Sequence, residues 1–169
     1  LAANDPAAAA GELQERWQAQ LPAEAAAWAW ASVARQAALK LSPEADGWFQ
    51  RATGLAASRD VDWNDDTLGW RVRAALRAAD PERWTRVLDA IAAMSGPTQA
   101  DPTWVYWKAR ALLATARSGT DGDAQRTAAN LLLERIAAHY SFYGKLAAEE
   151  LGRPQTLPPR PAPLSAEER

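Results

Sequence analysis

Proline follows an aspartate or a serine at four places in the chain, and this pattern constrains the fold more than any other feature. An Asp or Ser side chain can accept hydrogen bonds from a helix N-terminus, and proline suits the first helical position. The first three of these capping residues, Asp5, Ser42 and Asp80, are 37 and 38 residues apart. A further 38 residues leads to Ser118, just before a Gly-rich turn. The spacing predicts helix starts that recur about every 38 residues.

A second helix start is predicted within each period, near Pro22, Asn64, Asp101 and Ser141. Two helices per period indicate a series of helical hairpins, each of which buries its apolar side only against its neighbours. We therefore expect an all-α superhelix, an α-solenoid of about four hairpins stacked as a curved right-handed array. This superhelical domain is expected to occupy residues 1–152.

The apolar residues between these starts recur at helical spacing. One stripe runs from Trp30 through Ala34 to Leu41, and another contains Trp84, Leu88 and Ile91, which we expect to be buried between hairpins. Alanine dominates the composition, and nine tryptophans supply most of the bulk. Small residues let helices approach closely, while indole rings fill the spaces between them. No segment alternates with the period of two that a half-buried strand requires.

The sequence also indicates where helices end. Gly96-Pro97 and Gly152 read as helix stops. Beyond residue 152 the chain contains five prolines, so residues 153–169 are expected to form a Pro-rich linker or a tail laid on the surface. The first residues carry neither an initiating Met nor a basic leader region, and we interpret the chain as an excised or processed piece of a longer protein.

Composition excludes several classes of function. Nineteen Lys and Arg balance twenty-one Asp and Glu, which argues against a nucleic-acid partner. The absence of cysteine excludes disulfides and thiolate metal sites. No stretch of eighteen apolar residues lacks charges, so no transmembrane segment is expected.

Neither a metal site nor a catalytic site is predicted from the polar residues. Residues 60–66 begin like a calcium loop, but Asp65 replaces the glycine that the sharp turn needs and Arg71 replaces the bidentate Glu. His139 is the single histidine, and it is more typical of a helix C-terminus than of a triad. Glu149 and Glu150 are adjacent on a helix, so they diverge and are expected on a solvated face. No cofactor is expected.

Trp104, Trp107 and Arg110 form the one candidate binding site. They are three residues apart and share a helix face, which forms an aromatic shelf with a cation, a combination that can bind a sugar ring. However, Trp70 and Trp107 both begin a Trp-x-x-Arg-Ala segment, and residues that recur in successive repeats usually pack hairpin against hairpin. Both interpretations remain open, and packing is the favoured one.

Three segments in this order resemble the helical region of soluble lytic murein transglycosylases. They are Trp-Val-Tyr-Trp-Lys-Ala-Arg-Ala-Leu at 104–112, Leu-Leu-Leu-Glu-Arg-Ile-Ala at 131–137, and Tyr-Ser-Phe-Tyr-Gly-Lys-Leu-Ala-Ala-Glu-Glu-Leu-Gly at 140–152. The resemblance extends from about Trp70 to Gly152. It implies a periplasmic protein that acts on the glycan strands of peptidoglycan, in which an α-superhelix lies beside a lysozyme-like catalytic domain that cleaves bonds between N-acetylmuramic acid and N-acetylglucosamine.

The family's catalytic motifs are absent from these 169 residues. The Glu-Ser pair and the Gly-Leu-Met-Gln segment have no counterpart, because no Glu precedes Ser and the single Met, Met94, lies between Ala93 and Ser95. Glycosidic cleavage requires a positioned carboxylic acid. The resemblance therefore implies a non-catalytic superhelical domain that helps to hold or orient glycan for a catalytic domain elsewhere in the same polypeptide, inactive alone. The alternative is a stand-alone helical repeat scaffold that binds a peptide or protein.

Overall fold

The computed structural model describes residues 1–56 and 62–153, and all the regular secondary structure in these ranges is helical. The Pro-rich residues 154–169 and Asp60 of the acidic segment lie outside the described residues. The helices are α1 (Pro6–Glu12), the π-helical turn η1 (Leu13–Trp17), α2 (Ala23–Leu39), α3 (Ala45–Ala56), α4 (Asp65–Arg77), α5 (Arg83–Ala92), α6 (Gly96–Gln99), α7 (Pro102–Thr115), α8 (Thr120–Ala137) and α9 (Phe142–Glu150).

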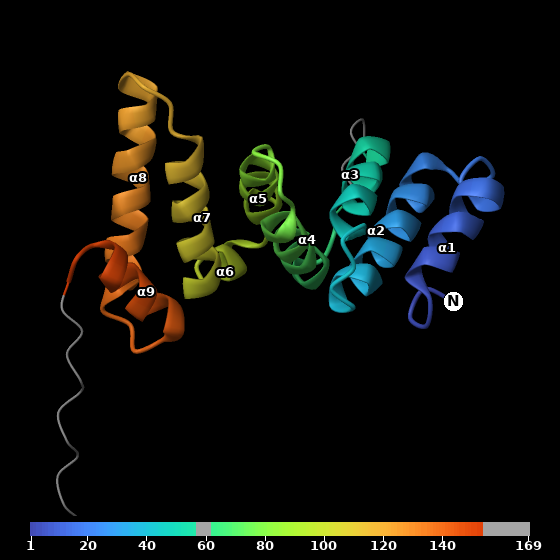
Figure 1. The fold of residues 1–169 in the computed structure, drawn as a ribbon, viewed down its shortest axis with the longest axis horizontal. Coiled ribbons are helices and arrows are strands. Elements are labelled where there is room, and N and C mark those ends of the chain that lie inside the picture. Colours follow the sequence, from blue (N-terminus) through green and yellow to red (C-terminus); the bar gives the residue numbers. More distant parts are fainter. Residues whose placement is uncertain (57–61, 154–169) are drawn as a thin grey trace, which may run out of the picture.

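The helices lie side by side in chain order along the long axis of the molecule, with α1 at one end and α8 and α9 at the other (Figure 1). The main contacts join helices of the same hairpin or of successive hairpins. Taken by the repeat period, the hairpins are α1–η1–α2, α3–α4, α5–α7 and α8–α9, and the most extensive contacts join α2 with α3, α7 with α8 and α4 with α5. The predicted all-α superhelical array is confirmed. No helix in the described part of the chain is long and apolar enough to cross a membrane.

Helix capping follows the predicted pattern at the second helix of most hairpins. Asn64 accepts a hydrogen bond from the backbone N–H of Thr67 (2.8 Å), and Ser141 accepts one from that of Gly144 (3.1 Å). Asp101 accepts likewise from the N–H of Thr103 (2.8 Å). These side chains satisfy amides that have no partner within the helix, which fixes where α4, α7 and α9 begin.

Three of the predicted helix boundaries differ in the structure. Ser42 and Asp80 do not cap their helices, which begin two or three residues later at Ala45 and Arg83. The Ser42 hydroxyl binds the Glu44 carboxylate, and Asp80 binds Arg86. The Gly96-Pro97 pair opens the short helix α6 instead of ending its predecessor. Asp65 accepts hydrogen bonds from the Ser95 N–H and hydroxyl (2.8 and 2.6 Å), which anchors that segment against α4.

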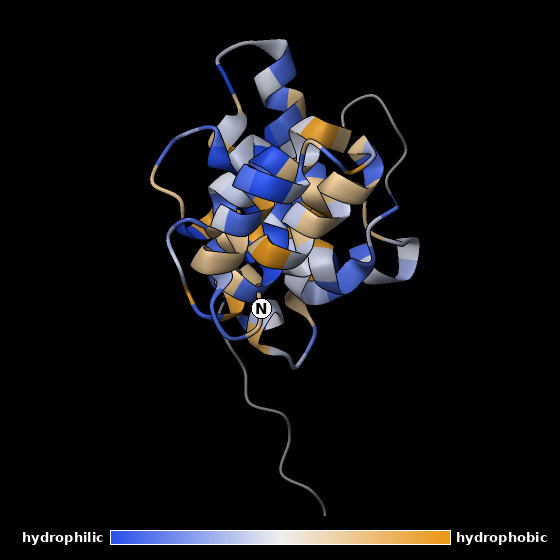
Figure 2. Ribbon diagram, turned by 90° about the vertical axis from the view of Figure 1, so that its right-hand side faces the viewer, coloured by the Kyte–Doolittle hydropathy of each residue, from blue (hydrophilic) through white to orange (hydrophobic). Residues whose placement is uncertain are grey.

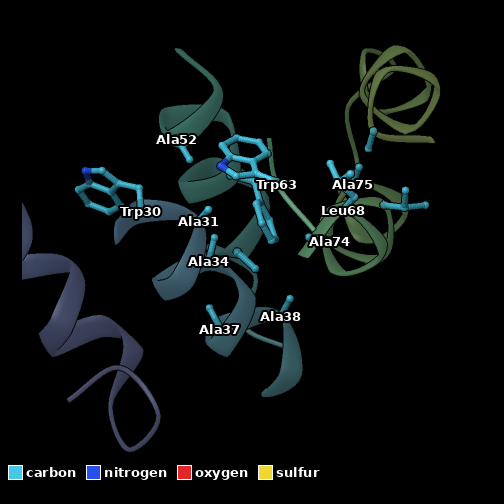
Figure 3. Packing of buried hydrophobic residues seen from close by; sticks show 14 of the residues in the cluster. Trp30, Ala31, Ala34, Ala37, Ala38, Ala52, Trp63, Leu68, Ala74 and Ala75 are labelled. Carbon is cyan, nitrogen blue, oxygen red and sulfur yellow. The ribbon is translucent and has the colours of Figure 1, made fainter. Parts of the chain in front are cut away.

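Alanines on α2 form the centre of the larger core. Ala27, Ala31, Ala34 and Ala37 are fully buried, and α3 and α4 pack against this helix. Figure 3 shows the alanines of α2 facing Ala52 of α3, with the Trp63 ring between α3 and α4. Seen from the α1 end of the array, the helices carry both hydrophobic and hydrophilic residues (Figure 2), as expected when each helix has one buried side.

Helix α7 belongs to two cores at once. Trp104 and Ala111 join the larger core, whereas Val105, Tyr106 and Ala109 join a second core with α8 and α9. Room for the Trp104 ring comes from Gly69 of α4, where an added Cβ would lie 3.1 Å from that ring. The last hairpin is thereby joined to the rest of the array through α7.

The predicted burial of the α5 stripe is confirmed in part. Ile91 is fully buried, but Trp84 and Leu88 are only partly buried. The guanidinium carbon of Arg83 lies 4.9 Å from the centroid of the Trp84 ring, so this indole lies at the border of the core beneath a charged group. Aromatic rings often occupy such borders, where a cation can cover the exposed face.

Gly144 of α9 lies against the backbone at the end of α8. An added Cβ there would lie 2.3 Å from the His139 carbonyl oxygen and 2.8 Å from that of Ile136. We predict that Gly144→Ala lowers the free energy of unfolding by roughly 1–3 kcal/mol, because backbone must move to relieve the overlap. Urea denaturation followed by circular dichroism measures this change.

Gly47 supplies a matched control within α3, where nothing lies within 4 Å of an added Cβ. Gly47→Ala is expected to raise stability by about 0.5–1 kcal/mol, the helix-propensity difference between the two residues. Equal effects of the two substitutions would contradict the close approach of α9 to the end of α8.

Candidate ligand-binding groove

The three residues of the predicted shelf do not share one surface in the structure. Trp104 is 8% exposed and packs against Gly69, with the Arg73 guanidinium carbon 5.1 Å from its ring centroid. Trp107 is partly buried and contacts both cores. The indole of Trp104 is therefore covered by the protein itself, and of the two tryptophans only Trp107 is positioned to meet a ligand.

The Arg110 side chain is paired with a residue of α9. Its guanidinium forms an ion pair with Glu150 and a hydrogen bond to the Tyr106 hydroxyl (3.3 Å), which also contacts Glu150 at 3.1 Å. Burial raises the pKa of Tyr106, so its hydroxyl stays protonated at neutral pH. Glu150 is exposed, as expected for a solvated face, and its carboxylate also links the last helix to α7.

A groove of about 290 Å³ crosses all four hairpins next to Trp107. Its sides come from α2, the start of α3, α4, α7 and α9. The lining residues are Ala38, Leu41, Ser42, Ala45, Trp70, Arg73, Ala74, Leu76, Arg77, Trp107 and Tyr143. The groove thus follows the row formed by one helix from each hairpin.

Aromatic side chains from three hairpins meet in this groove. Trp70 comes from α4, Trp107 from α7 and Tyr143 from α9. The Trp107 indole N–H donates to the Tyr143 hydroxyl at 3.3 Å, and their ring centroids are 6.4 Å apart at 67°. This edge-to-face contact fixes both rings while they line the groove.

Two arginines of α4 add positive charge to the groove. Arg73 is exposed, and its guanidinium carbon lies 4.9 Å from the Trp70 ring centroid. Arg77, one turn further on, donates to the Leu41 carbonyl at 3.0 Å. Leu41 itself has a left-handed φ of 59°, and its side chain is 59% exposed beside the groove.

The chemistry of this groove favours binding over catalysis. Aromatic faces next to arginines suit a ligand that has both apolar faces and a negative group, such as an acidic sugar. Among the described residues that line it, none is Asp, Glu or His. The described lining of the groove therefore supplies neither a carboxylate nor an imidazole as a general acid or base.

Sequence reasoning identified one residue of the groove and missed the others. Trp70, Arg73, Arg77 and Tyr143 line it with Trp107, whereas Trp104 and Arg110 do not. The available signal was the repeated Trp-x-x-Arg-Ala segment. Trp70 and Trp107 are 37 residues apart, one repeat period, and equivalent positions in stacked hairpins lie side by side.

Comparisons with known proteins add no assignment. No protein-family model matches the chain, and neither a curated protein nor a solved structure matches it. Any statement about its function consequently rests on its own residues and on the resemblance described above.

The contact between Arg110 and Glu150 can be tested by a double-mutant cycle. Both side chains are partly exposed, so Arg110→Met and Glu150→Gln should each lower the free energy of unfolding by about 1 kcal/mol or less. The double variant should lose less free energy of unfolding than the sum of the losses in the two single variants, as measured by urea denaturation. Additive losses would show that the pair does not couple α7 to α9 in solution.

Proposed function

We propose that this chain is the non-catalytic superhelical domain of a periplasmic lytic transglycosylase. In this proposal the groove through Trp70, Trp107 and Tyr143 helps to hold a peptidoglycan glycan strand. The lysozyme-like catalytic domain belongs to the same polypeptide and is outside these 169 residues. The observation that carries the proposal is the aromatic and arginine lining of the groove.

The location of the resembling segments supports the proposal. Residues 104–112 lie in α7, 131–137 in α8 and 140–152 in and around α9, and these three helices share the second core. The resemblance therefore covers one packed unit of the array. Two of the groove's aromatic residues, Trp107 and Tyr143, fall within these segments.

The chemistry of glycan strands also agrees with the groove. Pyranose rings present apolar C–H faces that pack on aromatic rings, and N-acetylmuramic acid adds a carboxyl group when its peptide is absent. Arg73 and Arg77 supply cations that can pair with such a carboxylate. A groove that crosses four hairpins suits an extended chain better than a compact ligand.

Exposed apolar side chains on the last hairpin agree with a neighbouring domain. Leu131, Tyr140 and Phe142 are 62%, 73% and 70% exposed. The ends of helical arrays are usually polar where they face water. In the proposed parent enzyme, the catalytic domain would cover part of this surface.

Binding to purified peptidoglycan sacculi tests the proposal directly. We expect the chain to sediment with sacculi, and we expect Arg73→Ala/Arg77→Ala to reduce the bound fraction by about tenfold, since charged hydrogen bonds are lost. Both arginines are exposed, and circular dichroism of the variant checks that losing their contacts with Trp104 and Leu41 leaves it folded. The control is Arg135→Ala, which removes an exposed cation from α8 outside the groove.

The outcomes separate the two candidate functions. Equal sedimentation of the parent and the groove variant would overturn the assignment of the groove. No sedimentation of either, with retained helicity, would remove the glycan proposal and leave the alternative, a repeat scaffold that binds a peptide or protein.

The chain alone is predicted to release no anhydro-muropeptides from sacculi, because the acid-base Glu of the resembled family is missing. The measurement is chromatography of the soluble fraction, with a catalytically competent lytic transglycosylase as the positive control. Release of soluble products by these residues, after removal of contaminating lysozyme, would contradict the non-catalytic assignment.

A further inference from the structure

A second cavity of about 290 Å³ lies among α3, α4 and α5 and shares no residue with the groove. Unlike the groove, it is lined mainly by charged and polar side chains. The lining residues are Asp46, Phe49, Gln50, Thr53, Gly54, Arg71, Arg86 and Asp89. Two of them, Asp46 and Arg71, are buried, as is the apolar wall formed by Phe49.

Several of the cavity's polar groups are already paired within the protein. Arg86 binds Asp46 at 2.9 Å and both oxygens of Asp80 at 2.9 and 2.7 Å. Hydrogen bonds from Arg86 lower the pKa of Asp80 to about 2. Gln50 donates its amide N–H to Asp46 at 2.9 Å. Arg86 and Asp46 therefore form a closed network that needs no ligand.

Arg71 lines the same cavity but lacks such a partner. The residue is only 9% exposed, and among the residues that the structure describes its guanidinium forms no hydrogen bond or ion pair. Its nearest aromatic neighbour is Trp63, whose ring centroid is 5.8 Å from the guanidinium carbon. Burial lowers the pKa of Arg71, yet arginine remains charged in proteins. Within the described residues, no nitrogen of Arg71 is a buried atom without a partner, so its guanidinium reaches the open cavity, where a ligand carboxylate can pair with it.

Asp89 is the second unpaired charge of the cavity. It lies on α5, is exposed, and forms no side-chain hydrogen bond or ion pair with any described residue. Its charge attracts that of Arg71, but the two side chains form no ion pair. Within the described part of the chain, the cavity thus holds one cation and one carboxylate that are not paired with each other. A simple anion would be repelled by Asp89 and Asp46, and a simple cation by Arg71 and Arg86.

We propose that this cavity binds a small zwitterion of the α-amino acid class. The ligand's carboxylate accepts hydrogen bonds from Arg71, and its ammonium group donates to Asp89. Its side chain packs against Phe49. A cavity of this size accepts a ligand of amino-acid size and excludes a folded partner. The inference does not depend on the proposed glycan function, because it uses different residues and a different ligand.

Calorimetric titration of the full chain tests this site. The probes are the common L-amino acids together with D-alanine and D-leucine, each titrated to about 10 mM, a range that detects weak small-ligand binding. At least one is expected to give saturable heat. The N-acetyl derivative of that amino acid keeps only the carboxylate, and the amino-acid amide keeps only the ammonium group. Each derivative should bind at least about tenfold more weakly than the amino acid itself.

Two variants assign the binding to these charges. Asp89→Asn alters an exposed side chain, should leave the fold unchanged, and should weaken the best probe by about tenfold or more. Arg71→Gln should abolish binding, and Asp89→Asn keeps the proposal testable if that buried variant fails to fold. Asp121→Asn, which changes an exposed carboxylate of α8, is the control and should bind normally.

Three outcomes would overturn the proposal. They are the absence of saturable heat with every probe, equal binding of the N-acetyl derivative, and unchanged affinity in Asp89→Asn. None of these results bears on sedimentation with sacculi. A failure of this inference can therefore be distinguished from a failure of the proposal that the groove binds glycan.

Discussion

Close approach between α2 and its neighbours is the constraint on which the rest of the structure depends. A hairpin array has no central core, so each hairpin is held only by the one before it and the one after it. Alanines such as Ala27, Ala34 and Ala37 are fully buried and let α3 and α4 pack closely against α2. Tryptophans then fill the wider spaces, as Trp30 and Trp63 do in the same core.

Helix α4 illustrates how such an array can carry two unrelated sites. One side of the helix presents Trp70, Arg73 and Arg77 to the groove, while Arg71 lines the charged cavity. Successive residues of a helix point about 100° apart, so neighbours in sequence serve different surfaces. On α7, contacts with other helices decide the surroundings of each tryptophan, because Trp104 packs against Gly69 whereas Trp107 lines the groove. The groove combines several residues of α4 with residues of other hairpins.

The two sites differ in what their residues can do. The groove combines aromatic faces with exposed arginines and has no carboxylate or imidazole among its described lining, which suits the holding of an extended acidic glycan. The cavity has a similar volume, but its lining is mainly charged and polar, with Phe49 as an apolar wall, which suits a compact charged ligand. The resemblance to lytic transglycosylases bears on the groove alone, through Trp107 and Tyr143.

The sequence alone determined the fold class, the repeat period and most helix starts. These depend on local chemistry: Asn64, Asp101 and Ser141 cap helices through amides two or three residues away. The tertiary structure decided which side chains remain available for a ligand. Trp104 is covered because Gly69 of another hairpin admits its ring, and Arg110 is engaged because α9 brings Glu150 beside it. Such contacts join residues far apart in the chain, and local sequence patterns do not record them.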